Sequence, residues 1–143
     1  MEKGLREEIL ECFPQKQTDI RMYSPLALAF LGDGVYSLIV RTMVISKGNR
    51  QAEKLHNDTR KYVSAQAQAR IGDAIQELLT EEEARIYRRG RNANPYHHAK
   101  NATLEEYLTA TALETLCGYL YLKDETARFL ELLKAGIERA GIG

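Results

Sequence analysis

An almost uninterrupted apolar run, LALAFLGDGVYSLIVRTMVIS over residues 26–46, constrains the fold more than any other part of the chain. It follows Ser24-Pro25, a typical helix start in which serine is the N-cap and proline takes the first helical position. The run approaches the length of a transmembrane span, but Asp33 and Arg41 lie inside it. We therefore expect a central helix buried in a globular protein, with no membrane partner.

Apolar residues recur at helical spacing along the rest of the chain. Residues 5–13 place their apolar side chains on one face of a helix, and so do residues 124–137. Residues 51–79 form a longer and more polar helical segment, which we expect to break near Gly72. We find no strand or hairpin pattern, so the prediction is an all-α protein.

Two capping boxes mark further helix starts. Thr80 with Glu83 starts a short helix that ends near Gly90, and Thr103 with Glu106 starts a longer apolar helix. The intervening segment is rich in asparagine and reads as a loop.

The composition is that of one ordinary folded domain. The 143 residues are 44% hydrophobic and 28% charged, which excludes a disordered or fibrous chain. Cys12 and Cys117 are too few for a disulfide framework, and residues 1–15 are too charged for a secretion signal. We predict a cytoplasmic, single-domain helical bundle over residues 1–143.

Asp33 is unusual because it lies between Gly32 and Gly34 in this apolar helix. A buried carboxylate needs a partner, and a glycine inside a helix costs about 1 kcal/mol relative to alanine. The two glycines therefore predict close approach by another helix or a ligand. The alternative is a buried structural aspartate that is hydrogen-bonded to a nearby side chain.

Glu114 is the second unusual carboxylate, in the apolar segment ALETLCGYLYL. Helical spacing places it on one face with Tyr107, Thr111, Gly118 and Tyr121. The alternative is a solvent-facing glutamate at a helix edge.

Asp33 and Glu114 are expected to be neighbours if their two helices are both central. Two inward carboxylates repel each other unless they are protonated or bridged by a cation. Carboxylate oxygens suit Mg²⁺, which takes one or two carboxylates and keeps several waters. The pair is therefore our candidate metal site, with Mg²⁺ as the cofactor.

A basic block, RIYRRGRNANPYHHAK over residues 85–100, contains no acidic residue. Lys plus Arg and Asp plus Glu number 20 each, so the whole-chain charge gives no support to nucleic-acid binding. A local basic surface can still follow a phosphate backbone. The alternative is a solvated surface balanced by the acidic residues 81–83.

Glu53 and His56 have the Glu-x-x-His spacing of di-iron bundles. That site needs a second copy of the motif and further glutamates, and the sequence has no second copy. A small-ligand or di-iron bundle remains an alternative function here, although an exposed pair on a polar helix is the simpler interpretation.

Three segments resemble the ribonuclease III family. FLGDGVYSLIV resembles its signature, in which a Phe-Leu-Gly-Asp core lies on a central helix, and ALETLCGYLYL resembles its later helix with the same Glu-x-x-x-Gly step. Between them, KYVSAQAQA resembles the helix that follows the signature in the short form of the family, Mini-ribonuclease III. The similarity spans about residues 20–125 in the family's order, and the RRGRNA run at residues 88–93 resembles the short form's basic loop.

This resemblance implies the fold of the ribonuclease III endonuclease domain and Mg²⁺-dependent hydrolysis of double-stranded RNA. It also implies a homodimer, products with 5′-phosphate and 3′-hydroxyl ends, and precursor large-subunit (23S) ribosomal RNA as substrate. Asp33 and Glu114 would be the catalytic residues and would hold the metal. The RNA-binding candidates are Arg88, Arg89, Arg91, Asn92 and Lys100.

Some acidic positions of full-length relatives are replaced in this chain. Ala29 and Leu26 stand where those relatives have glutamates, and Thr111 stands where they have an aspartate, as in the short form. Only Asp33 and Glu114 then remain as acidic ligands. This motivates an alternative, a non-catalytic RNA-binding or assembly dimer with the same fold.

Overall fold

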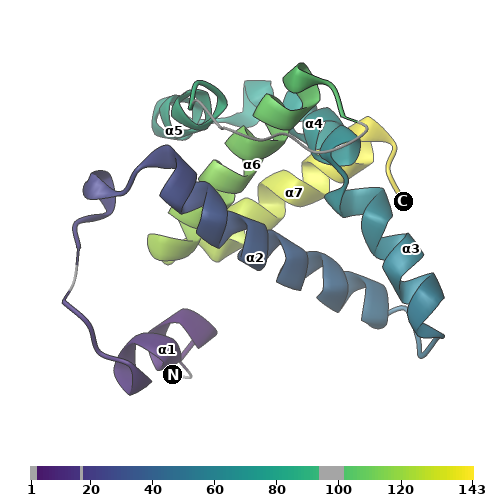
Figure 1. Cartoon of the computed structure of the whole chain (residues 1–143), viewed down its shortest axis with the longest axis horizontal. Helices are drawn as coiled ribbons and strands as arrows, with labels where there is room; N and C mark the ends of the chain where they lie inside the picture. Colours follow the sequence, from purple (N-terminus) through teal and green to yellow (C-terminus); the bar gives the residue numbers. More distant parts are fainter. Residues whose placement is uncertain (1–2, 17, 94–101) are drawn as a thin grey trace.

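The computed structural model describes residues 3–16, 18–93 and 102–143. All regular elements in these ranges are helical, so the all-α prediction is confirmed (Figure 1). The α-helices are α1 (Leu5–Cys12), α2 (Pro25–Ile45), α3 (Ala52–Val63), α4 (Ala65–Ala74), α5 (Glu81–Arg91), α6 (Leu104–Leu122) and α7 (Thr126–Ala140). Short 3-10 turns occupy Ile20–Met22 and Gln76–Leu78.

Helix α6 lies at the centre of the bundle, because its sequence is apolar on almost every side and most of its residues are buried. Helix α2 crosses it in the most extensive helix–helix contact, while α5 and α4 pack on its other sides and α7 covers α4 (Figure 1). The largest fully buried side chains include Tyr36, Phe129, Leu113, Leu116 and Leu120. Helix α1 lies apart from the bundle in the view of Figure 1.

Two glycines set the distance between α2 and α6. A methyl group on Gly32 would lie 1.7 Å from the carbonyl oxygen of Glu114, and one on Gly118 would lie 2.1 Å from the carbonyl oxygen of Leu28. The two backbones are therefore in direct contact at the crossing. The predicted close approach is confirmed at Gly32, whereas Gly34 has no atom within 4 Å of the same position.

Side-chain caps fix the helix starts as the sequence predicts. The Ser24 hydroxyl accepts a hydrogen bond from the backbone N–H of Ala27 at 3.1 Å, and both capping boxes are formed. The helical segment 51–79 breaks twice. The expected break near Gly72 is confirmed, because α4 ends at Ala74 and a 3-10 turn follows. The other break, at Ser64, was not predicted; Ser64 has an extended backbone and caps α4.

Gly90 also lies inside a helix, because α5 continues to Arg91 and is capped at Asn92. A methyl group at Gly90 would lie 2.4 Å from the Thr115 hydroxyl oxygen on α6. This glycine therefore allows α5 to approach α6 closely, and the expected helix end near Gly90 is confirmed to within one residue.

The prediction that α2 is wholly buried is wrong. One face packs on α6, but another exposes large apolar side chains, and Phe30 is 84% exposed. Helix α2 is long and apolar enough to cross a membrane by length and composition. Its packing on α6, α3 and α5 is that of a core helix in a bundle. The exposed apolar residues on α2 are Leu26, Phe30, Leu38 and Ile45.

Candidate active site

The α2–α6 crossing brings Asp33 and Glu114 together. Asp33 directly follows Gly32, whose backbone contacts the carbonyl group of Glu114 itself. The two carboxyl groups are near enough for Asp33 to raise the pKa of Glu114. Asp33 is exposed and Glu114 is partly buried behind it, so the pair is open to solvent on the Asp33 side. The alternative in which Asp33 is a buried structural residue is wrong.

Burial is the main cause of the raised pKa of the Glu114 carboxyl. It raises the pKa of Glu114 to about 8, and the neighbouring Asp33 carboxyl adds to this shift by hydrogen bonding and by repulsion. The inner side of the site is formed by Tyr36 and Cys117, both buried, and burial raises the pKa of each above its ordinary value. In the metal-free protein at neutral pH, Glu114 therefore carries a proton most of the time.

Gln68 on α4 is a member of the site that the sequence analysis missed. Gln68 is only 4% exposed, and its amide is near enough to the Glu114 carboxyl to lower the pKa of Glu114 and so favour the ionised form. Gln68 lies in the segment KYVSAQAQA, one of the three segments on which the family resemblance depends. The sequence does not single it out within that segment, because its amide is uncharged.

The residues present fit a hydrated, oxygen-preferring cation. Two carboxylates lie together, and the Oε1 atom of Gln68 is buried without a hydrogen-bond partner. A buried acceptor of this kind needs a donor, and a water on a bound ion would supply one. Within the described ranges there is no cluster of three or more His, Cys, Asp and Glu side chains, so the candidate protein ligands are the two carboxyl groups.

The predicted RNA-binding residues lie at the end of helix α5 and not in a loop. Arg88 and Arg89 are exposed in its last turn, and Arg91 is half-buried and pairs with Glu105 on α6. Asn92 is the exposed C-cap. Lys100 lies outside the described residues.

The acidic start of α5 is neutralised by partners inside the chain. Glu82 accepts a hydrogen bond from Lys123 Nζ at 2.7 Å, and Glu83 pairs with Arg128 Nε at 2.8 Å. The charge of Arg85 in the basic block also lowers the pKa of Glu82, so the basic block balances the acidic run only in part. Arg88 and Arg89 remain as an exposed positive surface at the C-terminal end of α5.

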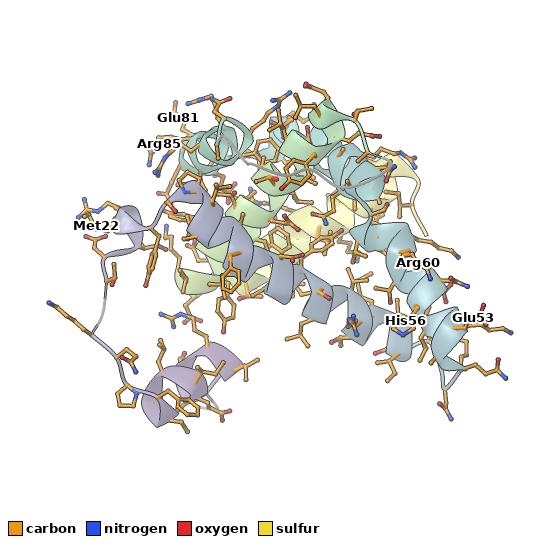
Figure 2. The ribbon with its side chains drawn as sticks, viewed as in Figure 1. Met22, Glu53, His56, Arg60, Glu81 and Arg85 are labelled. Atoms are coloured by element: carbon orange, nitrogen blue, oxygen red, sulfur yellow. The ribbon has the colours of Figure 1, made fainter. Side chains whose placement is uncertain are left out.

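Glu53 and His56 lie exposed on α3, on the opposite side of the view from Glu81 and Arg85 of α5 (Figure 2). With no cluster of three or more metal-binding side chains in the described ranges, the pair lacks the further ligands that a di-iron site requires. The di-iron hypothesis therefore has no structural support.

Comparison with known proteins decides the family. The ribonuclease III domain matches residues 26–125, a range that contains both carboxylates and the basic end of α5. The chain belongs to the ribonuclease III family. This membership makes it an endoribonuclease, and it makes Asp33 and Glu114 the first pair to test for catalysis.

Relatives within the ribonuclease III family include short proteins of similar size. A Mini-ribonuclease 3 of Clostridium tetani (strain Massachusetts / E88) is 43% identical over 117 residues, which are 81% of this chain and 78% of the relative. A Mini-ribonuclease 3 of Streptococcus pneumoniae (strain ATCC BAA-255 / R6) is 41% identical over 85% of this chain and 96% of its own. A crystal structure of a Fusobacterium nucleatum protein superposes with a TM-score of 0.76 and 32% identity, covering 85% of this chain and 98% of that one.

The raised pKa of Glu114 predicts a pH dependence of stability in the metal-free enzyme. A carboxyl whose pKa is higher in the folded state stabilises the fold fully below its unfolded value of 4.5, and this contribution is lost as the pH rises through about 8. The free energy of unfolding should fall by on the order of 3 kcal/mol over this range, because partial solvent access reduces the full effect of the raised pKa.

Urea unfolding in EDTA across this pH range measures the effect. The Glu114→Gln variant is the control, because it keeps the shape of the side chain but has no carboxyl to ionise, so its profile should stay flat where the wild type declines. Identical pH profiles for the two proteins would contradict the prediction.

Proposed function

We propose that this ribonuclease III family member cleaves double-stranded RNA with Mg²⁺ as cofactor. The observation that supports this proposal most directly is the proximity of Asp33 and Glu114 at the solvent-open side of the α2–α6 crossing. The two carboxylates are the kind of ligand that Mg²⁺ prefers, and the unpartnered amide oxygen can accept a hydrogen bond from a water on the ion. This set of groups suits Mg²⁺ better than a softer metal.

Each residue has a distinct part in this proposal. When bound, Mg²⁺ supplies a lowered pKa for an attacking water and neutralises charge on the phosphate. Asp33 offers its carboxylate from the solvent side, while Glu114 must release its proton before it can hold the ion. Tyr36 and Cys117 remain neutral and keep the inner side of the site dry.

The products in this proposal carry 5′-phosphate and 3′-hydroxyl ends, and the substrate is precursor 23S ribosomal RNA in the cytoplasm. The resemblance to the short form of the family supports this substrate, as do the relatives named Mini-ribonuclease 3. A-form RNA is read mainly through its shape, phosphates and 2′-hydroxyls, so a chain with no net charge needs only a local basic surface to bind it.

We also propose that the enzyme is a homodimer joined through α2. Leu26, Phe30, Leu38 and Ile45 form an exposed apolar stripe at helical spacing, and Asp33 lies at its edge. A row of large exposed apolar side chains along one helix is typical of a protein interface. Light scattering should give twice the 16.2 kDa of one chain, whereas a monomer mass would contradict the proposal.

Removing the positive charge at the end of α5 should weaken RNA binding. We expect Arg88→Ala with Arg89→Ala to flatten the salt dependence of duplex binding by about one unit of slope per lost phosphate contact. Both side chains are exposed, so the fold should keep its stability to within about 0.5 kcal/mol.

Filter binding at several salt concentrations measures this slope. Arg70→Ala is a matched control, because Arg70 is also an exposed arginine but lies on α4 and bonds to the carbonyl oxygen of Ala140. An unchanged slope in the Arg88 and Arg89 variant would show that this helix end does not meet the phosphates.

Digestion of a long RNA duplex tests the proposed function directly. Single-stranded RNA and duplex DNA of the same sequence are the comparison substrates, and Mg²⁺ is titrated with an EDTA control. We expect Mg²⁺-dependent cleavage of duplex RNA alone. Cleavage of single strands, or cleavage that persists in EDTA, would overturn the proposal.

A further inference from the structure

The helix break at Ser64 leaves backbone carbonyl groups without helical partners. Ser64 takes an extended conformation between α3 and α4, so the carbonyl groups at the end of α3 lack continuing N–H donors. Two side chains satisfy them. The Tyr36 hydroxyl donates to the carbonyl oxygen of Tyr62 at 2.6 Å, and Gln68 Nε2 donates to that of Val63 at 3.0 Å.

Both side chains also adjoin Glu114. The Tyr36 ring is near enough for the Glu114 charge to affect it, and the Gln68 side chain is near enough to the Glu114 carboxyl to favour its ionised form. An amide nitrogen has two N–H groups, so one can hold Val63 while the other holds Glu114. Gln68 therefore links the break in the chain to the carboxylate.

The backbone of α4 gives Gln68 little freedom to move. Ser64 caps the start of the helix by accepting from the Ala67 N–H at 3.2 Å. Further along, a methyl group on Gly136 of α7 would lie 2.8 Å from the Ile71 side chain, so α7 presses closely on α4. The hydrogen bond from Nε2 to Val63 orients the buried amide and leaves its Oε1 without a hydrogen-bond partner.

We propose that Gln68 is the positioning residue of the active site, with its amide holding the Glu114 carboxylate in the orientation that binds the divalent cation. The inference rests on the proposed Mg²⁺ dependence. Groups that orient metal ligands typically change metal affinity or activity by about 10-fold to 100-fold when they are removed.

The test replaces Gln68 with Met, which keeps the length of the side chain but has no N–H donor. We expect Mn²⁺, used as the probe ion without RNA in calorimetry, to bind about 10-fold more weakly, and the half-saturating Mg²⁺ concentration for cleavage to rise by a similar factor. The cleavage rate at saturating Mg²⁺ should recover most of the loss. A purely structural role would lower the rate at every metal concentration.

Gln76→Met is the matched control. Gln76 Nε2 also donates to a backbone carbonyl, that of Gly72 at 2.7 Å, but Gln76 is exposed and has no contact with Glu114 in the described interactions. The control should bind Mn²⁺ as the wild type does. If Gln68→Met keeps wild-type Mn²⁺ affinity and Mg²⁺ requirement, the proposal is overturned.

A measurement on the wild type covers the case in which Gln68→Met does not fold. The side-chain amide resonances of Gln68 should shift on Mg²⁺ addition in ¹H–¹⁵N spectra, whereas those of Gln76 should not. Unchanged Gln68 resonances at saturating Mg²⁺ would overturn the proposal. A wild type that neither binds Mn²⁺ nor requires Mg²⁺ would instead refute the proposed cofactor, which is a separate result.

Discussion

Replacing Asp33 with Asn or Glu114 with Gln is expected to lower RNA cleavage by about 10³-fold or more while the protein remains folded. Each substitution keeps the size of the side chain and removes a negative charge. An amide is a poor replacement for a carboxylate as a Mg²⁺ ligand, because it contributes no net charge to the ion. Glu114 is mostly protonated in the metal-free protein at neutral pH, so a neutral amide of the same size at either position should not destabilise the fold.

Gel analysis of a duplex substrate measures the rate, and circular dichroism with light scattering checks the fold and the mass. Duplex binding should persist in both variants, because Arg88 and Arg89 at the end of α5 are unchanged. Cleavage at the wild-type rate by both variants would remove the case for this pair as the catalytic centre.

Replacing Gly32 with Ala should be strongly destabilising. The added methyl group would lie 1.7 Å from the Glu114 carbonyl oxygen, and neither backbone can move aside without separating α2 from α6. Overpacking of this severity is expected to cost about 3 kcal/mol or more and to lower the melting temperature by on the order of 10 °C. Cleavage should fall as well, because the same crossing holds the two carboxylates together.

Gly34→Ala is the matched control on the same helix. The position has no atom within 4 Å of a new methyl group, and alanine is about 1 kcal/mol better than glycine inside a helix. This variant should therefore melt at a higher temperature than the wild type. Similar melting temperatures for Gly32→Ala and Gly34→Ala would contradict the packing argument.

Local hydrogen bonds made the helix starts predictable from sequence. Ser24, Thr80 and Thr103 each carry a side-chain oxygen that accepts from a backbone N–H within the next three residues. Such caps depend on a few neighbouring residues only, so the sequence contains all the information that they need. The approach of another helix at Gly32 was also predictable, because a glycine inside a helix destabilises that helix and so indicates a close contact that a larger residue would block.

A glycine in the sequence does not by itself show whether it ends a helix or allows a neighbouring helix to pack closely. Gly90 and Gly72 lie within two residues of helix ends, as expected, but both also lie inside helices and allow a neighbouring side chain to approach. The break at Ser64, which was not predicted, depends on how α4 fits beneath α6 and α7, which is a property of the whole bundle. Arg91 was expected just past the helix end, although it is the last residue of α5.

The exposed face of α2 could not be predicted because the helix is apolar on nearly every side. Hydrophobicity indicates that a surface avoids water but does not say whether the same chain or a second chain covers it. Gln68 was not predicted as a site residue for a different reason. An amide carries no charge, so its importance depends on the atoms around it, and these come from α3 and α6 as well as its own helix.

The contact at Gly32 and Gly118 is made by main-chain atoms, which every sequence shares. Substitutions among interior leucines away from the crossing should therefore have little influence on the spacing between Asp33 and Glu114. A random library confined to those leucines should lose thermal tolerance well before it loses turnover per folded molecule. The protein can thus accumulate neutral changes in its interior while the arrangement of the two carboxyl groups is kept.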